Sequence, residues 1–346
     1  MKIKLSFYYL FPILLSINLL FSCGRDNTIV ENNNKKKDTT NTKASDEFKL
    51  LNSQLISDPN NAELYYSRAK LYFKKKYYDE SLADMKQALK IDSSKASYYL
   101  TLSDLYFITN KTGNAKIALE KCILLDDKNT DAMLKLAELF LYVRKHEQSM
   151  KYINMALKVN QYNAKAYFMK GMNYKELKDT AKAISSMQTA VEQDQQYYNA
   201  YIQLGLLCAN KRNPLAIQYY KNAIRIQANS AEAWYNLGIY YQDIQDWDNA
   251  IKTYTSLLQI DAHNKNANYN MGVINLLNFK KYDIAINHFS NAIKMEPNYV
   301  QAYYGRAICL QSKGNVKAAA VDFQKCLDIN PKFENAEIAL KAINNK

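Results

Sequence analysis

Few side chains in this 346-residue chain have the types and spacing that catalysis or metal binding requires. The three histidines, His146, His263 and His288, lie far apart, and none belongs to an H-E-x-x-H motif. The sequence also lacks a Gly-rich phosphate loop, a G-x-S-x-G elbow and a C-x-x-C pair. Because an active site needs titratable groups that converge, we expect no enzyme, no metal site, no cofactor and no small-molecule substrate.

Four of the five cysteines lie within apolar patterns. Cys122, Cys208 and Cys326 occupy positions where helical spacing favours burial, and a buried free thiol acts as a small hydrophobic group. Cys309 and Cys326 fall on neighbouring predicted helices, so a disulfide between them is an open alternative in an oxidising compartment.

The fifth cysteine, Cys23, closes a long uncharged segment. Lys2 and Lys4 precede residues 5–24, which are mostly apolar, as in the two first regions of a secretory signal. The segment ends in the letters L-F-S-C-G, which resemble the lipobox of bacterial lipoproteins. The resemblance implies a signal peptide over residues 1–22, cleavage before Cys23, and acylation of Cys23 by fatty acids such as palmitate.

An uncleaved membrane anchor is the alternative interpretation of this segment, because about 20 apolar residues cross a bilayer. Pro12, Ser16 and Asn18 interrupt the apolar stretch and weigh against that alternative. Residues 23–45 are rich in Asn, Lys and Thr, and we expect them to form a lipidated flexible tether. The expected location is the cell envelope, with the lipid in the outer membrane and the protein on its periplasmic or surface face.

The composition predicts helices joined by short turns. Gly occurs 8 times and Pro 5 times, while 48% of the residues are apolar. So few turn-forming residues exclude collagen-like chains and most small β-sandwiches. The net charge is +13, but only six of the 46 basic residues are Arg, the side chain suited to bidentate phosphate contacts. We therefore expect no nucleic-acid partner.

Most of the chain repeats with a period of 33 to 35 residues. When each unit is numbered from position 1, starting at Ala62, small residues recur at positions 8, 20 and 27, and large residues at positions 4, 11 and 24. Positions 4, 8 and 11 follow the periodicity of one helix and positions 20, 24 and 27 that of a second, so each unit contains two helices, here called helix A and helix B. Small residues let the two helices approach closely, and neighbouring units must stack to cover their apolar faces.

This pattern resembles the tetratricopeptide repeat, and the sixth unit, AEAWYNLGIYYQDIQDWDNAIKTYTSLLQIDA, fits it best. The resemblance implies an all-α, right-handed superhelical solenoid of about eight helix-turn-helix units with flanking helices, over residues 46–346. The expected repeats are 62–95, 96–129, 130–163, 164–197, 198–230, 231–264, 265–299 and 300–333, with a C-terminal capping helix at 334–346. Asn268 and Asn275 replace large residues in the seventh unit, which we expect to be the least stable.

In that family helix A lines a concave surface, which positions 2, 5, 9 and 12 face. From the fourth unit onward positions 5 and 9 are apolar here, and position 6 adds two amides, so the resemblance implies a groove for a protein or peptide. The predicted groove residues are Phe168, Met172, Ile202, Leu206, Tyr235, Asn236, Ile239, Tyr269, Asn270, Val273, Tyr304 and Ile308. Packing of these residues between helices is the alternative. Position 5 holds no Lys, which argues against the Lys-based clamp that some members use for acidic C-terminal tails.

Together these features predict a membrane-anchored, non-catalytic scaffold or assembly factor at the bacterial cell envelope. The lipid on Cys23 would contact the membrane, and the concave groove would bind a protein or peptide. A structural spacer lipoprotein without a dedicated peptide ligand is the alternative function.

Overall fold

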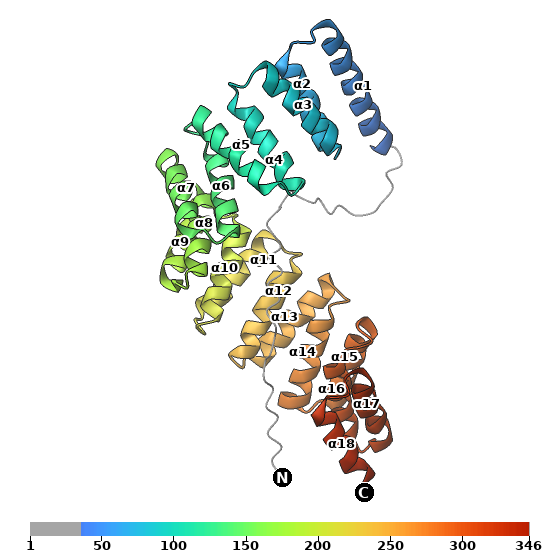
Figure 1. Ribbon diagram of the computed structural model, residues 1–346. Coiled ribbons are helices and arrows are strands. Elements are labelled where there is room, and N and C mark those ends of the chain that lie inside the picture. The colour runs from blue at the N-terminus through green and yellow to red at the C-terminus, as the bar shows by residue number, and fades with distance from the viewer. Residues whose placement is uncertain (1–35, 346) are drawn as a thin grey trace.

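The computed structural model describes residues 36–345, which form α-helices and one π-helical turn, with no strand in that range (Figure 1). The elements are α1 (Lys36–Ser57), α2 (Ala62–Lys74), α3 (Tyr78–Ile91), α4 (Ala96–Ile108), α5 (Thr112–Leu125), α6 (Thr130–Tyr142), α7 (His146–Val159), α8 (Ala164–Glu176), α9 (Thr180–Gln193), α10 (Tyr198–Ala209), α11 (Leu215–Ile226), α12 (Ala231–Asp243), α13 (Trp247–Ile260), α14 (Lys265–Ile274), η1 (Asn275–Phe279), α15 (Tyr282–Met295), α16 (Val300–Ser312), α17 (Val316–Ile329) and α18 (Glu334–Asn344). The predicted signal peptide and Cys23 lie outside the described residues.

The helices form antiparallel pairs that stack in chain order into a curved solenoid (Figure 1). Helix A of each of the eight units is one of the even-numbered helices from α2 to α16, and helix B follows it. Each helix contacts its chain neighbours, and successive A helices such as α6 and α8 also touch. This arrangement confirms the expected all-α solenoid, in which a single unit cannot cover its apolar faces alone.

The first helix, α1, begins at Lys36, inside the segment that the sequence predicts to be a flexible tether. That prediction is wrong for residues 36–45, which are helical. The C-terminal half of α1 is held by the first repeat, since Leu51 and Leu55 are buried and the Phe48 ring lies 4.8 Å from that of Tyr72. Once this half is fixed, each further helical residue adds a hydrogen bond without a new nucleation cost.

Helices A and B of a unit approach most closely at position 8. A Cβ atom on Gly205 or Gly238 would lie 2.4 Å from the ring of Tyr220 or Tyr254 on helix B. Only Gly therefore leaves room for these large, fully buried rings. In the first three units position 8 holds Ala or Ser, which is larger than Gly, and position 24 holds Met, Leu or Ile in place of an aromatic ring. These buried pairs are Ala69 with Met85, Ser103 with Leu119 and Ala137 with Ile153.

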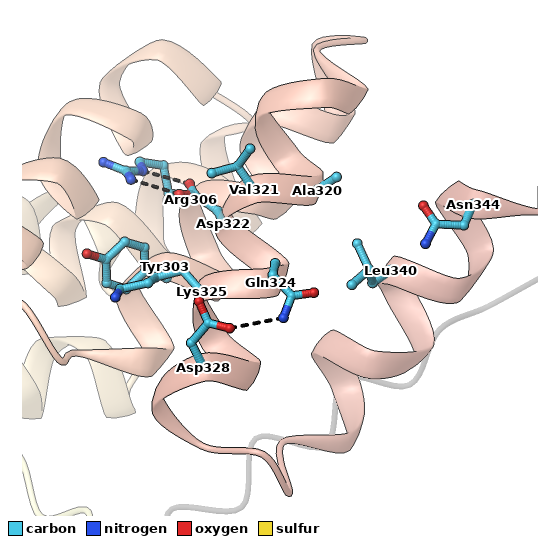
Figure 2. A pocket seen from close by; sticks show the side chains of 10 residues that line it. All are labelled: Tyr303, Arg306, Ala320, Val321, Asp322, Gln324, Lys325, Asp328, Leu340 and Asn344. Carbon is cyan, nitrogen blue, oxygen red and sulfur yellow. Dashed lines mark hydrogen bonds and ion pairs between the residues drawn. The ribbon is translucent and has the colours of Figure 1, made fainter.

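The first and last repeats share an ion pair between positions 7 and 23. Arg306 donates two hydrogen bonds of 2.8 Å to the carboxylate of Asp322 (Figure 2). Arg68 does the same to Asp84 at 2.7 and 2.8 Å. A further nitrogen of each guanidinium reaches the preceding helix, at Asn52 in one case and Ser290 in the other. Arg306 and Asp322, two of the charged residues that line a hollow of about 620 Å³ at this end of the solenoid, thus already satisfy each other.

The seventh repeat carries an extra residue and a polar interior. The extra residue is accommodated within helix A, as the π-helical turn Asn275–Phe279. The buried Asn275 amide donates to the Met271 carbonyl at 2.8 Å, and buried Asn268 lies 3.3 Å from the ring of His288. A single-residue insertion inside a helix commonly takes this π-bulge form. Burial also lowers the pKa of His288.

Candidate functional site

The surface most suited to binding is the strip formed by positions 2, 5, 6, 9 and 12 of the eight A helices, here called the A-helix face. Contacts between successive A helices make it continuous, as where Tyr66 on α2 and Thr101 on α4 share a hydrogen bond of 3.1 Å. Farther along, the Lys175 ammonium on α8 donates to the Gln203 side chain on α10 at 2.7 Å. Side chains from neighbouring repeats therefore line one surface rather than eight separate ones.

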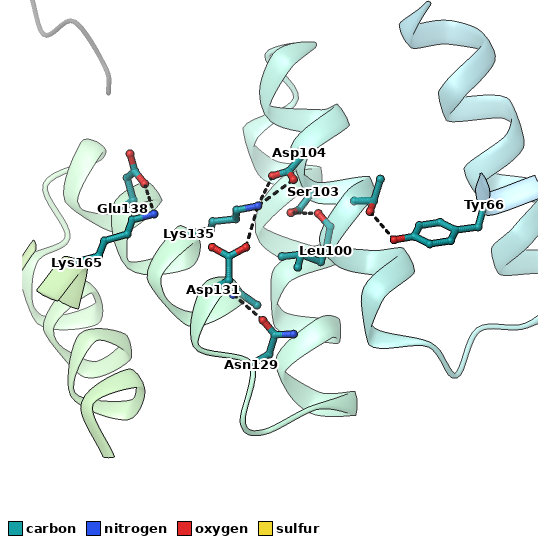
Figure 3. Close-up of polar contacts among 11 residues, drawn as sticks. Tyr66, Leu100, Ser103, Asp104, Asn129, Asp131, Lys135, Glu138 and Lys165 are labelled. Atoms are coloured by element: carbon teal, nitrogen blue, oxygen red, sulfur yellow. Dashed lines mark hydrogen bonds and ion pairs between the residues drawn. The ribbon is translucent and has the colours of Figure 1, made fainter. Parts of the chain in front are cut away.

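The N-terminal part of the A-helix face is held together by opposite charges (Figure 3). The Lys135 ammonium on α6 donates to both carboxylate oxygens of Asp104 on α4, at 2.8 and 2.9 Å. It also lies 3.3 Å from Asp131 on its own helix, one turn earlier. One repeat further, Lys165 on α8 pairs with Glu138 on α6 at 4.0 Å. These charges are engaged within the solenoid and are therefore less available to a partner.

The pKa values of this network follow from burial and from the paired charges. Burial by itself lowers the pKa of Lys135, but the hydrogen bond to Asp104 and the nearby carboxylates outweigh burial and raise it overall. Burial raises the pKa of Glu138, and Lys165 and Lys135 offset only part of that rise. Lys175 has no carboxylate on the face beside it, and burial lowers its pKa. The ammonium of Lys135 is thus the most firmly held charge of the three.

The C-terminal part of the A-helix face is almost uncharged. Position 9 forms a column of partly exposed aliphatic side chains, Leu206, Ile239, Val273 and Ile308. Between α14 and α16 the face encloses a cavity of about 30 Å³, with room for roughly one water molecule. Its walls are mainly apolar side chains, and its lining residues are Tyr269, Val273, Leu276, Leu277, Phe289, Gln301, Tyr304, Gly305 and Ile308.

The structure brings the predicted groove residues onto one face but does not leave all of them accessible. Phe168, Ile202 and Asn270 are buried, with 4%, 2% and 8% exposure, so they pack inside the solenoid and do not form the exposed groove surface that the sequence predicts. The Asn270 amide donates instead to the Tyr254 hydroxyl at 3.0 Å, inside the repeat. The partly exposed predicted residues are Met172, Leu206, Tyr235, Asn236, Ile239, Tyr269, Val273, Tyr304 and Ile308.

The tyrosines at position 5 belong mainly to the packing between helices. The Tyr269 ring lies 5.8 Å from Phe289 on helix B, and the Tyr304 ring lies 5.7 Å from Phe323. Tyr269 also contacts Tyr299 at 5.0 Å. The alternative of packing between helices therefore describes these rings better than a role in binding. The aliphatic column at position 9 is the surface that remains for a partner.

Sequence reasoning missed both sets of ion pairs. The pairs on the A-helix face join position 9 of one unit to a nearby position of the next. Asp104 is at position 9 of the second unit, and Lys135 and Glu138 are at positions 6 and 9 of the third. A comparison of neighbouring A helices would have shown opposite charges at these facing positions. The terminal pairs have a clearer signal. Arg at position 7 and Asp at position 23 occur together only in the first and last units, where the four residues are Arg68, Asp84, Arg306 and Asp322.

Metal ligands, membrane-spanning helices and reactive thiols are the remaining features of residues 36–345 that bear on chemistry. Within this range no three His, Cys, Asp or Glu side chains gather closely enough to hold a metal ion. None of the described helices combines the length and apolar character that a bilayer span needs. Cys122, Cys208, Cys309 and Cys326 are buried free thiols, and burial raises the pKa of Cys309 and of Cys326 to about 12. Such thiols are unreactive at neutral pH.

Comparisons with known proteins agree with this architecture. Models of the tetratricopeptide repeat match residues 62–94, 96–129, 164–197, 206–267 and 300–333, more than half of the chain. The chain is a tetratricopeptide repeat protein. The solved C-terminal part of a repeat-containing protein from Cytophaga hutchinsonii superposes with a TM-score of 0.62, covering 70% of this chain and 99% of that one at 19% identity. At that identity the likeness concerns the fold alone.

Curated relatives match this tetratricopeptide repeat protein over parts of their length. Hsp70-Hsp90 organizing protein 3 from Arabidopsis thaliana is 41% identical over 54 residues, which are 16% of this chain and 10% of that protein. A DnaJ homolog subfamily C member 7 homolog from Dictyostelium discoideum is 23% identical over 206 residues, or 55% of this chain and 38% of that protein. The chain thus spans less than two fifths of either relative.

Proposed function

We propose that this protein is a lipid-anchored scaffold at the bacterial cell envelope and that it binds a segment of another protein along the C-terminal part of the A-helix face. The observation that carries the proposal is the charge distribution along that face. In units five to eight its five positions hold one charged residue, Glu232, and the aliphatic column at position 9 lies partly exposed. A partly exposed apolar strip on a soluble domain commonly marks a partner site.

The surroundings of the column indicate the chemistry of the segment. Asn and Gln side chains flank it, at Asn199, Asn236, Asn266, Gln301 and Gln311. Amides donate and accept hydrogen bonds, so they suit the backbone of an extended or helical segment. The segment would place apolar side chains on the column. The name of the relative from Arabidopsis thaliana describes a protein that organises Hsp70 and Hsp90, which supports a scaffold role but not the same partners.

The lipid anchor rests on the sequence around Cys23. Metabolic labelling with a radioactive or clickable palmitate tests it. We expect label on the wild-type chain and none on a Cys23→Ala variant. Label that persists in the variant, or no label on the wild type, would contradict acylation at Cys23. Separation of inner and outer membranes in the same experiment tests the proposed location.

Crosslinking in intact cells followed by mass spectrometry separates the scaffold from the structural spacer. A scaffold should yield the same partner in independent experiments, linked to residues of α10, α12, α14 or α16. A spacer should yield no recurrent partner above the level seen for an unrelated lipoprotein. The second result would contradict the proposed binding function while leaving the lipid anchor intact.

A further inference from the structure

The two edges of the solenoid, where the chain turns from one helix to the next, differ in charge. Because helices A and B are antiparallel, all turns from A to B lie along one edge and all turns from B to A along the other. The A-to-B turns contain two acidic residues, Asp179 and Asp246, and eleven basic ones: Lys75, Lys76, Lys111, Arg144, Lys145, Lys178, Lys211, Arg212, Lys280, Lys281 and Lys313. The B-to-A turns contain seven acidic residues and three basic ones, Lys95, Lys128 and Lys332.

Five of the eleven basic residues at the A-to-B edge have a backbone conformation that does not suit them. Each helix A ends at a residue with positive φ, including Arg144 at 57°, Lys178 at 61° and Arg212 at 52°. Gly is the residue that takes this conformation without strain, and Gly314 does so in the last repeat. Strained residues that persist often have a functional reason. Here Arg144, Lys178 and Arg212 have this conformation and are exposed.

Three adjacent turns combine this charge with exposed apolar side chains. They connect α6 to α7, α8 to α9 and α10 to α11, in repeats that pack directly against one another (Figure 1). Large apolar residues beside the basic ones are well exposed, namely Tyr142 (57%), Val143 (47%), Leu177 (52%) and Leu215 (49%). Within residues 36–345, none of the five basic residues in these turns lies in an ion pair.

We infer that this edge, formed by the turns at residues 142–145, 177–179 and 210–215, rests on the surface of a membrane that contains anionic phospholipids. Lys and Arg near a bilayer are attracted to anionic headgroups, and adjacent apolar side chains insert at the boundary with the acyl chains. The inference goes beyond the proposed function, since it concerns a different surface and does not depend on acylation of Cys23.

The shape of the surface favours a bilayer over an acidic protein. The basic and apolar residues stand on tips that protrude from the ends of helices, where they can enter a layer of headgroups. Protein–protein interfaces are depleted in Lys, whereas three of the five basic residues in these turns are Lys. One of the five charges is partly engaged, because Arg212 offsets some of the rise that burial causes in the pKa of Asp243. Arg144 and Lys178 are therefore the residues to change.

Photocrosslinking in vesicles tests the inference with the full chain. A photoreactive phenylalanine derivative replaces Leu177 at the basic edge or, as a matched control, Tyr162 in the turn before α8, which is 67% exposed at the opposite edge. The chain is reconstituted in vesicles of phosphatidylcholine alone or with phosphatidylglycerol. We expect lipid adducts at position 177, only with phosphatidylglycerol, and none at position 162. Equal adducts at both positions, or no dependence on phosphatidylglycerol, would overturn the inference.

Two double variants in the position-177 background complete the test. Arg144→Gly with Lys178→Gly removes two charges and relieves the backbone strain. Each charge lost should weaken membrane binding about fivefold, so the yield of lipid adducts should fall roughly 30-fold. The midpoint of thermal unfolding should rise because the strain is gone. Lys95→Ala with Lys128→Ala removes the same charge from the opposite edge and should leave the adducts unchanged. If both double variants lose adducts equally, the overall net charge of the protein, and not this edge, accounts for membrane binding. If the protein binds soluble poly-glutamate in preference to vesicles, the edge is a site for an acidic protein. Either result contradicts a membrane contact.

Discussion

The two halves of the A-helix face differ in charge although each is built from the same kind of two-helix repeat. Units one to four place eight charged residues at its five positions, and four of these pair across repeats, Lys135 with Asp104 and Lys165 with Glu138. Units five to eight place one charged residue there and join their repeats through aromatic rings. One half therefore uses its polar groups to hold neighbouring repeats together, and the other leaves aliphatic surface for a partner. The shared fold does not determine which half binds.

The halves also differ in how helices A and B are spaced. Ala or Ser at position 8 faces Met, Leu or Ile in the first three units, whereas Gly faces Tyr in units five and six. The second combination inserts a large flat ring between the helices and leaves no volume for a Cβ atom. Substitutions at position 8 should therefore differ in cost between the two halves.

The largest effect on stability is expected from Gly238→Ala. Its Cβ atom would lie 2.4 Å from the Tyr254 ring, so we expect the free energy of unfolding to fall by about 2–3 kcal/mol, as in an overpacked core. The reverse change in the first half, Ala69→Gly, should cost only about 1 kcal/mol of helix propensity. Urea unfolding followed by circular dichroism measures both. Adding Tyr254→Leu to Gly238→Ala should recover part of the loss, and purely additive effects would refute the steric explanation.

The terminal ion pairs allow a smaller and more specific test. Asp322→Ala leaves the half-buried guanidinium of Arg306 without its carboxylate and should cost about 2 kcal/mol. The double variant Arg306→Leu with Asp322→Ala gives the last unit the apolar pair that the second unit has at the same positions, Leu102 with Ala118. Its midpoint of thermal unfolding should lie near that of the wild type. Thermal unfolding of the three proteins decides the matter. A double variant as unstable as the single one would show that the pair itself stabilises the last repeat.

The smallest effect is expected from Asp104→Asn, which weakens the link between the second and third repeats by about 1 kcal/mol. The pKa of Lys135 is higher in the folded protein than in the unfolded chain. The stability that the ion pair contributes is therefore fully present below the unfolded pKa of about 10.4, and it is lost as the pH rises through the folded pKa. The difference in unfolding free energy between wild type and variant should therefore stay constant from about pH 6 to 9. It should shrink above about pH 10.5, and a difference that already declines at neutral pH would contradict this assignment.

The repeat frame was predictable because residue types recur at positions 4, 8 and 11 and at positions 20, 24 and 27, and the spacing within each group specifies a helix. The groove was predictable only in part. Periodicity places Phe168, Ile202 and Asn270 on the A-helix face, but the depth at which each lies depends on how far the next A helix approaches, and they are buried. The helical start of α1 at Lys36 was missed because its residues have weak helix propensity, and packing of the following residues extends the helix.

Capture of the crosslinked partner in intact cells tests the central claim most directly. Leu206→Lys with Ile239→Lys places two charges in the uncharged half of the A-helix face, and Leu100→Lys with Leu141→Lys places two in the ion-paired half as the matched control. Circular dichroism verifies that both variants are folded. We predict that the first variant loses the partner and that the second retains it. Unchanged capture by the first variant, or equal loss in both, would contradict a binding site in the C-terminal half.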